Sequence, residues 1–262
     1  MGPATTRIMS FPALRLPAVM GHRGAAGLAP ENTLAGFRRA AALGVTWVEL
    51  DVRLSADGVA VLSHDESLAR ATGLRRKVGR LLHADIEGLD AGAWFGESFR
   101  GETLPTLAQA LRLLAQLNVG VNIEVKRHEG QETRVMNAVA GALADAWPTV
   151  LVPALISSFD PAIVAAAQHR LPDLPRALIA ERLPRTWRSL ADSLACSAIH
   201  LNWKAANDGR ISAIHAAGLG VAVYTVNEAP IARRLWAMGV DCVITDRPDV
   251  LMAARTEQEK AR

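Results

Sequence analysis

Residues 46–54 read TWVELDVRL, a run in which apolar residues alternate with Glu49, Asp51 and Arg53. Side chains two positions apart on a strand point to the same face, so Glu49 and Asp51 project together, about 7 Å apart. On a solvent-facing strand such a pair would be ordinary. A different interpretation is favoured here, because GHRG (21–24), SHD (63–65) and NIEVK (122–126) also end short apolar runs with charged residues or histidine. We expect one site, in which oxygens bind a hard divalent cation beside imidazoles and fixed cations.

Strand and helix patterns alternate regularly along most of the chain. Strands are expected at residues 18–22, 46–54, 119–126, 154–158, 177–180, 198–203, 220–226 and 242–245, each followed by a helix. An Asp57-Gly58 turn returns the chain in a short strand that ends at His64. This order predicts an α/β fold, a (β/α)8 TIM-type barrel forming one domain over residues 1–262. Residues 66–103 fit neither period and are interpreted as a small insertion after the second strand.

Composition excludes several functional classes. The 262 residues are 50% hydrophobic and 21% charged, which is enough to bury a full core. The formal net charge of +3 is spread along the chain, and the one cluster, Arg75, Arg76, Lys77 and Arg80, is interpreted as a solvated face. Nucleic acid is therefore not an expected partner.

The sequence also bears on membrane insertion, secretion and the redox state of the cysteines. No apolar run approaches the roughly 20 residues that span a bilayer, so stable membrane insertion is not expected. The segment before Val19 is broken by prolines, which argues against a secretory signal. Cys196 and Cys242 stand far apart, which indicates reduced core thiols and excludes zinc held by cysteine.

Three carboxylates supply the expected metal ligands. Glu49, Asp51 and Glu124 lie on two strands, and they suit Mg²⁺ or Ca²⁺ while leaving positions for water or substrate. Arg23 and Lys126 follow at strand ends and are placed to offset an anionic substrate, most simply a phosphate. They could equally pair with the carboxylates and close the end of the barrel, and the pattern does not separate these two interpretations.

Two histidines stand beside the carboxylates in the strand order. His22 ends the first strand and His64 ends the hairpin. With an ordinary pKa of about 6.5, one imidazole can be neutral and the other protonated near neutral pH, as a general base and a general acid require. We therefore expect catalysis from this pair, whereas His200, without such company, is expected in the core or at an interface.

Seven blocks of the chain resemble the glycerophosphodiester phosphodiesterase family, in its order and at its spacings. They are GHRGAAGLAPENT (21–33), VELDVRLSADGVAVLSHDESLAR (48–70), VNIEVK (121–126), ISSF (156–159), AIHLNW (198–203), YTVN (224–227) and GVDCVITDRPD (239–249). The resemblance is closest to the compact bacterial cytoplasmic enzymes of glycerophosphodiester uptake and recycling. It implies a barrel with an insertion and metal-dependent cleavage of glycerophosphodiesters to sn-glycerol 3-phosphate and an alcohol.

Site roles are implied residue by residue. His22 and His64 become the acid-base pair, and the three carboxylates become metal ligands. Arg23 and Lys126 become phosphate contacts. The resemblance also brings in Glu31, which would support His22 or the metal, and Asn32, which would cap the following helix. Trp203 and Tyr224, at the ends of later strands, would form a wall against the glycerol.

Other functions remain open on the sequence. A phospholipase-type phosphodiesterase on the same barrel would form a cyclic phosphate or act on lysolipid, but it needs an apolar rim, for which Trp94 and Phe95 are the few candidates. A binding barrel without chemistry would be expected to lack a carboxylate or a histidine. The expected assembly is a monomer or a homodimer with a small-molecule substrate.

Overall fold

The computed structural model describes residues 14–148 and 151–260 and shows eight parallel strands that close into a barrel. The barrel strands are β1 (Val19–Gly21), β2 (Trp47–Leu54), β4 (Gly120–Val125), β5 (Leu155–Ser158), β6 (Arg176–Ala180), β7 (Ala198–Asn202), β8 (Gly220–Tyr224) and β9 (Cys242–Thr245). β1 pairs with β9 on one side and β2 on the other, which closes the sheet. The predicted (β/α)8 barrel is confirmed.

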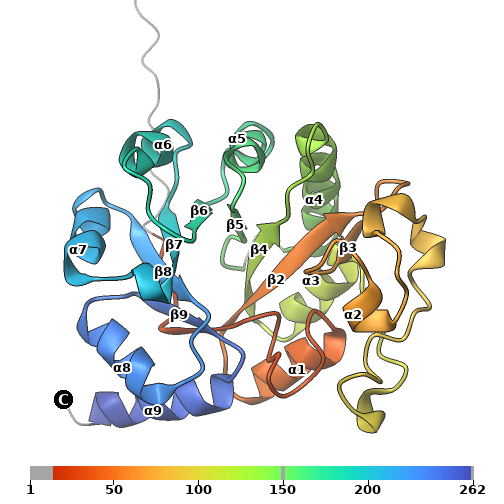
Figure 1. Cartoon of the computed structure of the whole chain (residues 1–262), viewed down its shortest axis with the longest axis horizontal. Helices are drawn as coiled ribbons and strands as arrows, with labels where there is room; N and C mark the ends of the chain where they lie inside the picture. The colour runs from red at the N-terminus through yellow and green to blue at the C-terminus, as the bar shows by residue number, and fades with distance from the viewer. Residues whose placement is uncertain (1–13, 149–150, 261–262) are drawn as a thin grey trace, which may run out of the picture.

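Helices lie around the strands, as Figure 1 shows. They are α1 (Leu34–Ala42), α3 (Leu107–Gln116), α4 (Glu132–Ala146), α5 (Pro161–Arg170), α6 (Trp187–Ser193), α7 (Asp208–Ala216), α8 (Ala229–Ala237) and α9 (Pro248–Lys260). None of the helices in the described part of the chain combines the length and the apolar character needed to cross a membrane.

The insertion follows a hairpin on β2. β3 (Ala60–Leu62) runs antiparallel to β2, and the chain then forms α2 (Ala69–Thr72) and the 3₁₀ turns Val78–Arg80, His83–Asp85 and Glu97–Phe99. Apolar side chains of this region form a cluster of their own: Val61, Leu68, Val78, Leu81, Ile86, Ala91 and Leu104. In Figure 1 the insertion with α2 lies beside β3, at one side of the barrel.

Alternation along β2 separates two environments. Val48, Leu50 and Val52 belong to the core cluster that the strands share with α1 and α3. Trp47 belongs instead to the cluster that fills the amino-terminal end of the barrel. A Cβ on Gly120, its partner across the sheet, would come within 2.5 Å of the Trp47 ring, so glycine is required there. Because Glu49 shares the face of Trp47, the carboxylates point into the barrel above an apolar floor.

His200 lies in the barrel, two residues beyond Ala198 of the same apolar floor, and is 1% exposed. This confirms the core position expected from sequence. Its Nε2 has no hydrogen-bond partner among the described residues. Burial lowers the pKa of His200 to about 4, because the charged imidazolium would lose its hydration.

Acid should therefore destabilise the fold through His200. Its folded pKa lies below the unfolded value, so between pH 6.5 and 4 the unfolded chain binds a proton that the folded chain rejects, and stability is lost as pH falls. The full difference corresponds to about 3 kcal/mol. We expect His200→Leu to flatten the fall of the unfolding free energy between pH 7 and 4.5, measured by urea denaturation. The exposed His169, changed to Ala, is the control, and equal slopes in both variants would contradict this account.

Candidate active site

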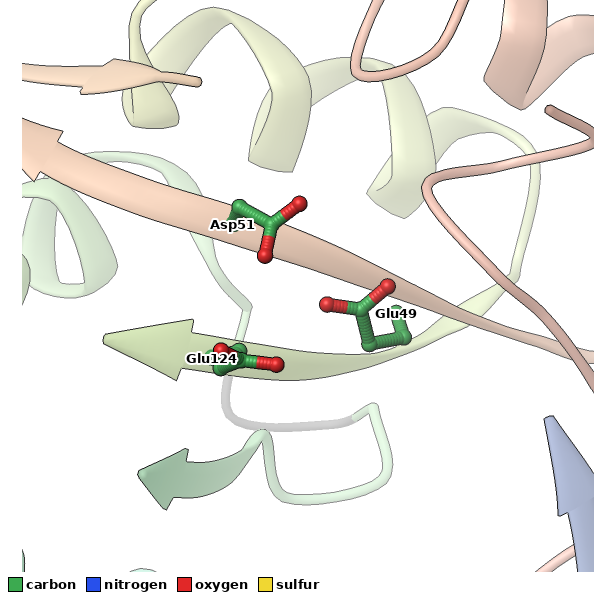
Figure 2. Close-up of side chains that lie close together, drawn as sticks. All are labelled: Glu49, Asp51 and Glu124. Atoms are coloured by element: carbon green, nitrogen blue, oxygen red, sulfur yellow. The ribbon is translucent and has the colours of Figure 1, made fainter. Parts of the chain in front are cut away.

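Three carboxylates meet inside the carboxyl-terminal half of the barrel. Glu49 and Asp51 project from β2 and Glu124 from the neighbouring β4, as Figure 2 shows. One oxygen of each lies within 4.8 Å of the others, and the residues are 2%, 0% and 8% exposed. The pairing of Asp51 with Glu124 across the sheet sets this proximity. The structure thus brings these three residues together, and their role as metal ligands stays a prediction.

Two cations lie against the carboxylates. Lys126 Nζ lies 2.6 Å from Asp51 Oδ1 and also contacts Glu124, while Arg23 Nε lies 3.1 Å from Asp51 Oδ2. The structure thus shows the carboxylate pairing that the sequence left open, and contact of these two cations with a substrate phosphate stays a prediction. These ion pairs outweigh burial and hold the pKa of Asp51 well below its usual range.

Glu49 has the opposite electrostatic environment. Burial and the neighbouring charge of Asp51 raise the pKa of Glu49 to about 8, and burial likewise raises that of Glu124. Glu49 Oε1 is buried and accepts no hydrogen bond from any residue in the described ranges. A buried carboxylate oxygen without a donor is costly, and a divalent cation would satisfy it and favour the ionised forms. The donor set, all oxygens from carboxylates, fits Mg²⁺ or Ca²⁺.

The loop between β1 and α1 holds Asp51 and Glu49 from the side. Arg23 and Asn32 both adopt left-handed backbone conformations, with φ of 49° and 56°. The Arg23 N–H donates to Glu49 Oε2 at 2.9 Å. Asn32 donates from Nδ2 to Asp51 Oδ2 at 2.8 Å and accepts the Asp51 N–H at 3.1 Å.

Asn32 was therefore assigned wrongly as the cap of α1. Thr33 caps the helix instead, because its Oγ1 accepts the N–H of Gly36 at 3.1 Å. Asn32 cannot do the same, since both ends of its amide are used by Asp51 and its backbone is left-handed.

His22 is held by a carboxylate at the end of β9. Its Nδ1 lies 2.6 Å from Asp246 Oδ1, and Asn227 Nδ2 donates to the other oxygen of Asp246 at 2.8 Å. His22 Nε2 lies 3.9 Å from Glu49 Oε2. Burial alone would lower the pKa of His22, but the hydrogen bond to Asp246 and the charge of Glu49 raise it above its ordinary value. Sequence reasoning missed Asp246, although it stands in the block GVDCVITDRPD.

His64 has a different setting just beyond β3. Its Nδ1 lies 2.7 Å from Asp65 Oδ1, and its side chain is 37% exposed. Burial lowers the pKa of His64, and the charge of Asp51 only partly opposes this effect. Both imidazoles are thus fixed through Nδ1 by a carboxylate, which leaves each Nε2 for another partner.

An ion-pair network connects the insertion to the site. Arg70 of α2 donates to Asp65 at 2.7 Å and to both oxygens of Glu31 at 2.6 and 2.8 Å. Glu31 also accepts from Arg23 at 3.0 Å. Glu31 therefore contacts the cation beside Asp51, and within the described ranges it makes no hydrogen bond or ion pair to His22. Arg70 was missed in the sequence, because its spacing from the other residues depends on the path of the insertion.

Aromatic residues lie at the ends of the later strands. The Tyr224 hydroxyl lies 3.4 Å from Glu181 Oε1, and its ring meets the exposed Phe159 edge-on at 5.8 Å between centroids. Trp203 is half-buried and packs on the cluster between strands and helices. Neither Phe159 nor Glu181 had been singled out in the sequence.

Comparison with known proteins agrees with this geometry. The model of the glycerophosphoryl diester phosphodiesterase family matches residues 22–250. A glycerophosphodiester phosphodiesterase of Caldanaerobacter subterraneus subsp. tengcongensis is 31% identical over 239 residues, covering 89% of this chain and 96% of that protein.

Solved structures give the same picture. A phosphodiesterase of Oleispira antarctica, solved with the product sn-glycerol-3-phosphate, is 36% identical with a TM-score of 0.90, covering 92% of this chain and 97% of that one. A glycerophosphodiester phosphodiesterase of Agrobacterium tumefaciens is 32% identical with a TM-score of 0.74, covering 91% and 100%. On this evidence the chain belongs to the glycerophosphoryl diester phosphodiesterase family.

Proposed function

We propose that this protein hydrolyses glycerophosphodiesters to sn-glycerol 3-phosphate and an alcohol. The observation that carries the proposal is the cluster of Glu49, Asp51 and Glu124 beside His22 and His64, in a chain of this family. The product bound by the Oleispira antarctica relative supports the choice of substrate. A cytoplasmic location and a monomeric or homodimeric state are further parts of the proposal.

Glu49, Asp51 and Glu124 would hold a divalent cation, Mg²⁺ or Ca²⁺. When bound, the cation supplies Lewis-acid stabilisation of charge on a phosphoryl oxygen. Arg23 and Lys126 each have several donors, so they can keep contact with Asp51 while donating to phosphate oxygens. Their support by Glu31 and Glu124 keeps both cations oriented toward the cluster.

His22 and His64 are the proposed acid-base pair. In a phosphodiester displacement the nucleophile loses a proton and the departing alkoxide gains one, so two groups are needed. Asp246 and Asp65 fix the two rings through Nδ1, which leaves Nε2 of each for proton transfer. Tyr224 and Trp203 complete the proposed site as parts of the wall around the glycerol, with Glu31 behind Arg23.

Metal removal tests the ligand set. Excess EDTA followed by dialysis should abolish release of glycerol 3-phosphate, and Mg²⁺ or Ca²⁺ should restore it, because the carboxylates alone repel a phosphate. Glu49→Gln should lower metal affinity about 10-fold or more, measured by calorimetry. The exposed Glu87, changed to Gln, is the matched control. Full turnover in chelator would refute the assigned ligands.

Substrate choice separates hydrolysis of soluble diesters from lipid cleavage. Glycerophosphocholine and glycerophosphoethanolamine should both release glycerol 3-phosphate, with kcat/KM within about 10-fold of each other, because the proposed contacts bind the phosphodiester. Intact phosphatidylcholine should be a poor substrate. A coupled assay for glycerol 3-phosphate, with mass spectrometry of the products, measures both. Faster cleavage of the intact lipid, or a cyclic phosphate as the end product, would favour the phospholipase-type alternative.

Histidine variants test the acid-base roles. His22→Ala and His64→Ala should each lower kcat by about 10² to 10⁴ on glycerophosphocholine. A nitrophenyl diester needs little protonation of its leaving group, so it should rescue one variant far more than the other, and the rescued position is the general acid. His169→Ala is the control. Equal rescue of both variants, or loss of metal binding in either, would show that the roles are wrong.

A further inference from the structure

A cavity separate from the carboxylate cluster lies beyond the end of β2, between the insertion and the loop that enters α4. Its volume is about 300 Å³, and none of the site residues predicted from sequence lines it. The charged residues in its wall are Arg53, Lys77, Arg80, Arg127, Glu66 and Glu129. Lys77 and Arg80 belong to the basic cluster that was expected to be a solvated face; both are exposed, and both also line this cavity.

The charges of the wall do not balance. Glu66 pairs with Lys77 at 3.0 Å, and Glu129 pairs with Arg127 at 3.4 Å. Within the described ranges, neither Arg53 nor Arg80 has a carboxylate within 4.0 Å, so neither guanidinium group makes an ion pair. Cations without a direct ion pair around one cavity favour an anion in it.

Arg53 makes the stronger case of the two, because it is half-buried. Its Nε and Nη2 both donate to the backbone carbonyl of His64, at 3.0 and 2.8 Å. A carbonyl satisfies these hydrogen bonds but carries no charge, and the carboxylates of Asp51, Glu66 and Asp65 act on the guanidinium only from a distance. In the described part of the chain this partly desolvated cation therefore has no counterion in direct contact. An anion in the cavity would supply it.

Neighbouring groups give the cavity a fixed wall. His128 donates from Nδ1 to the Lys126 carbonyl at 2.6 Å and accepts the Leu54 N–H on Nε2 at 2.9 Å, so both ring nitrogens are engaged. α4 begins directly after Gln131, which also lines the cavity, and the Gln131 side chain does not cap the helix. The positive end of the α4 dipole lies at the same place, and Glu132 in the first turn offsets part of it.

We propose that this cavity is a second anion site that binds a phosphate group, next to but distinct from the carboxylate cluster. Two guanidinium forks match phosphate oxygens better than they match a single carboxylate. The phosphate belongs either to a free phosphate ion or to the alcohol portion of a substrate. Because Arg53 also holds the His64 carbonyl, an occupant that draws on Arg53 is coupled to the position of His64.

Binding of inorganic phosphate tests the site without relying on turnover. The titration is done by calorimetry in EDTA, so that no metal ion at the carboxylate cluster takes part in phosphate binding. Wild-type protein should bind one phosphate per chain, and Arg80→Gln should weaken binding about tenfold. Arg75→Gln is the matched control, since Arg75 is exposed in the same segment and does not line the cavity, and it should stay within about twofold. No wild-type binding, or equal weakening in both variants, overturns the proposal.

A kinetic experiment identifies the source of the phosphate. If the ion binds free, inorganic phosphate at constant ionic strength should change kcat or KM for glycerophosphocholine in wild type, and Arg80→Gln should remove the response. If the substrate supplies it, Arg80→Gln should raise KM only for a glycerophosphodiester whose alcohol carries a phosphate. Either result supports the site. If the protein does not hydrolyse glycerophosphocholine, the kinetic experiment gives no signal, but phosphate binding can still be measured by calorimetry. Failure of the proposed function and failure of the anion site are therefore distinguishable.

Discussion

Burial of the Asp51 carboxylate inside a closed barrel is the constraint on which the rest of the site depends. The side chain is 1% exposed, so its charge persists only because protein groups replace water on both oxygens. Lys126, Arg23 and Asn32 supply those groups, and each comes from a different segment of the chain. Removing any one would leave a buried charge under-compensated, which typically costs several kcal/mol. Burial of Glu49 and the neighbouring charge of the ionised Asp51 together raise the pKa of Glu49.

This requirement explains the shape of the loop that follows β1. Left-handed backbone at Arg23 and Asn32 carries a cost of about 1 kcal/mol or more for each residue. The conformation aims the Arg23 N–H at Glu49 and both ends of the Asn32 amide at Asp51. Hydrogen bonds to buried charges are each worth about 1.5–3 kcal/mol, which exceeds the backbone cost. Local strain is therefore tolerated because it stabilises buried charge on a neighbouring strand.

Sequence patterns predicted the barrel and the carboxylate cluster for definite physical reasons. Period-two alternation on β2 and β4 shows which residues share a face, and parallel strand ends must meet at one rim. Contacts that depend on the path of a loop could not be predicted from these patterns. Asp246 reaches His22 and Arg70 reaches Glu31 across 224 and 39 residues of sequence separation, with no periodic signal linking them. Asn32 misled because Asn is a common helix cap, and only the tertiary demand of Asp51 overrides that preference.

Two arginines, one in the insertion and one on β2, act on His64. Arg70 of α2 binds Asp65, which fixes His64 Nδ1 and so acts on the imidazole ring. On the other side, Arg53 of β2 binds the His64 carbonyl at the wall of the cavity that Lys77 and Arg80 help to line. The side chain and the backbone of His64 are thus held by two different arginines. Because the residue is 37% exposed at its side chain, these polar contacts, rather than core packing, set its position. A change of charge at Arg70 can therefore affect His64 through Asp65 without altering the barrel.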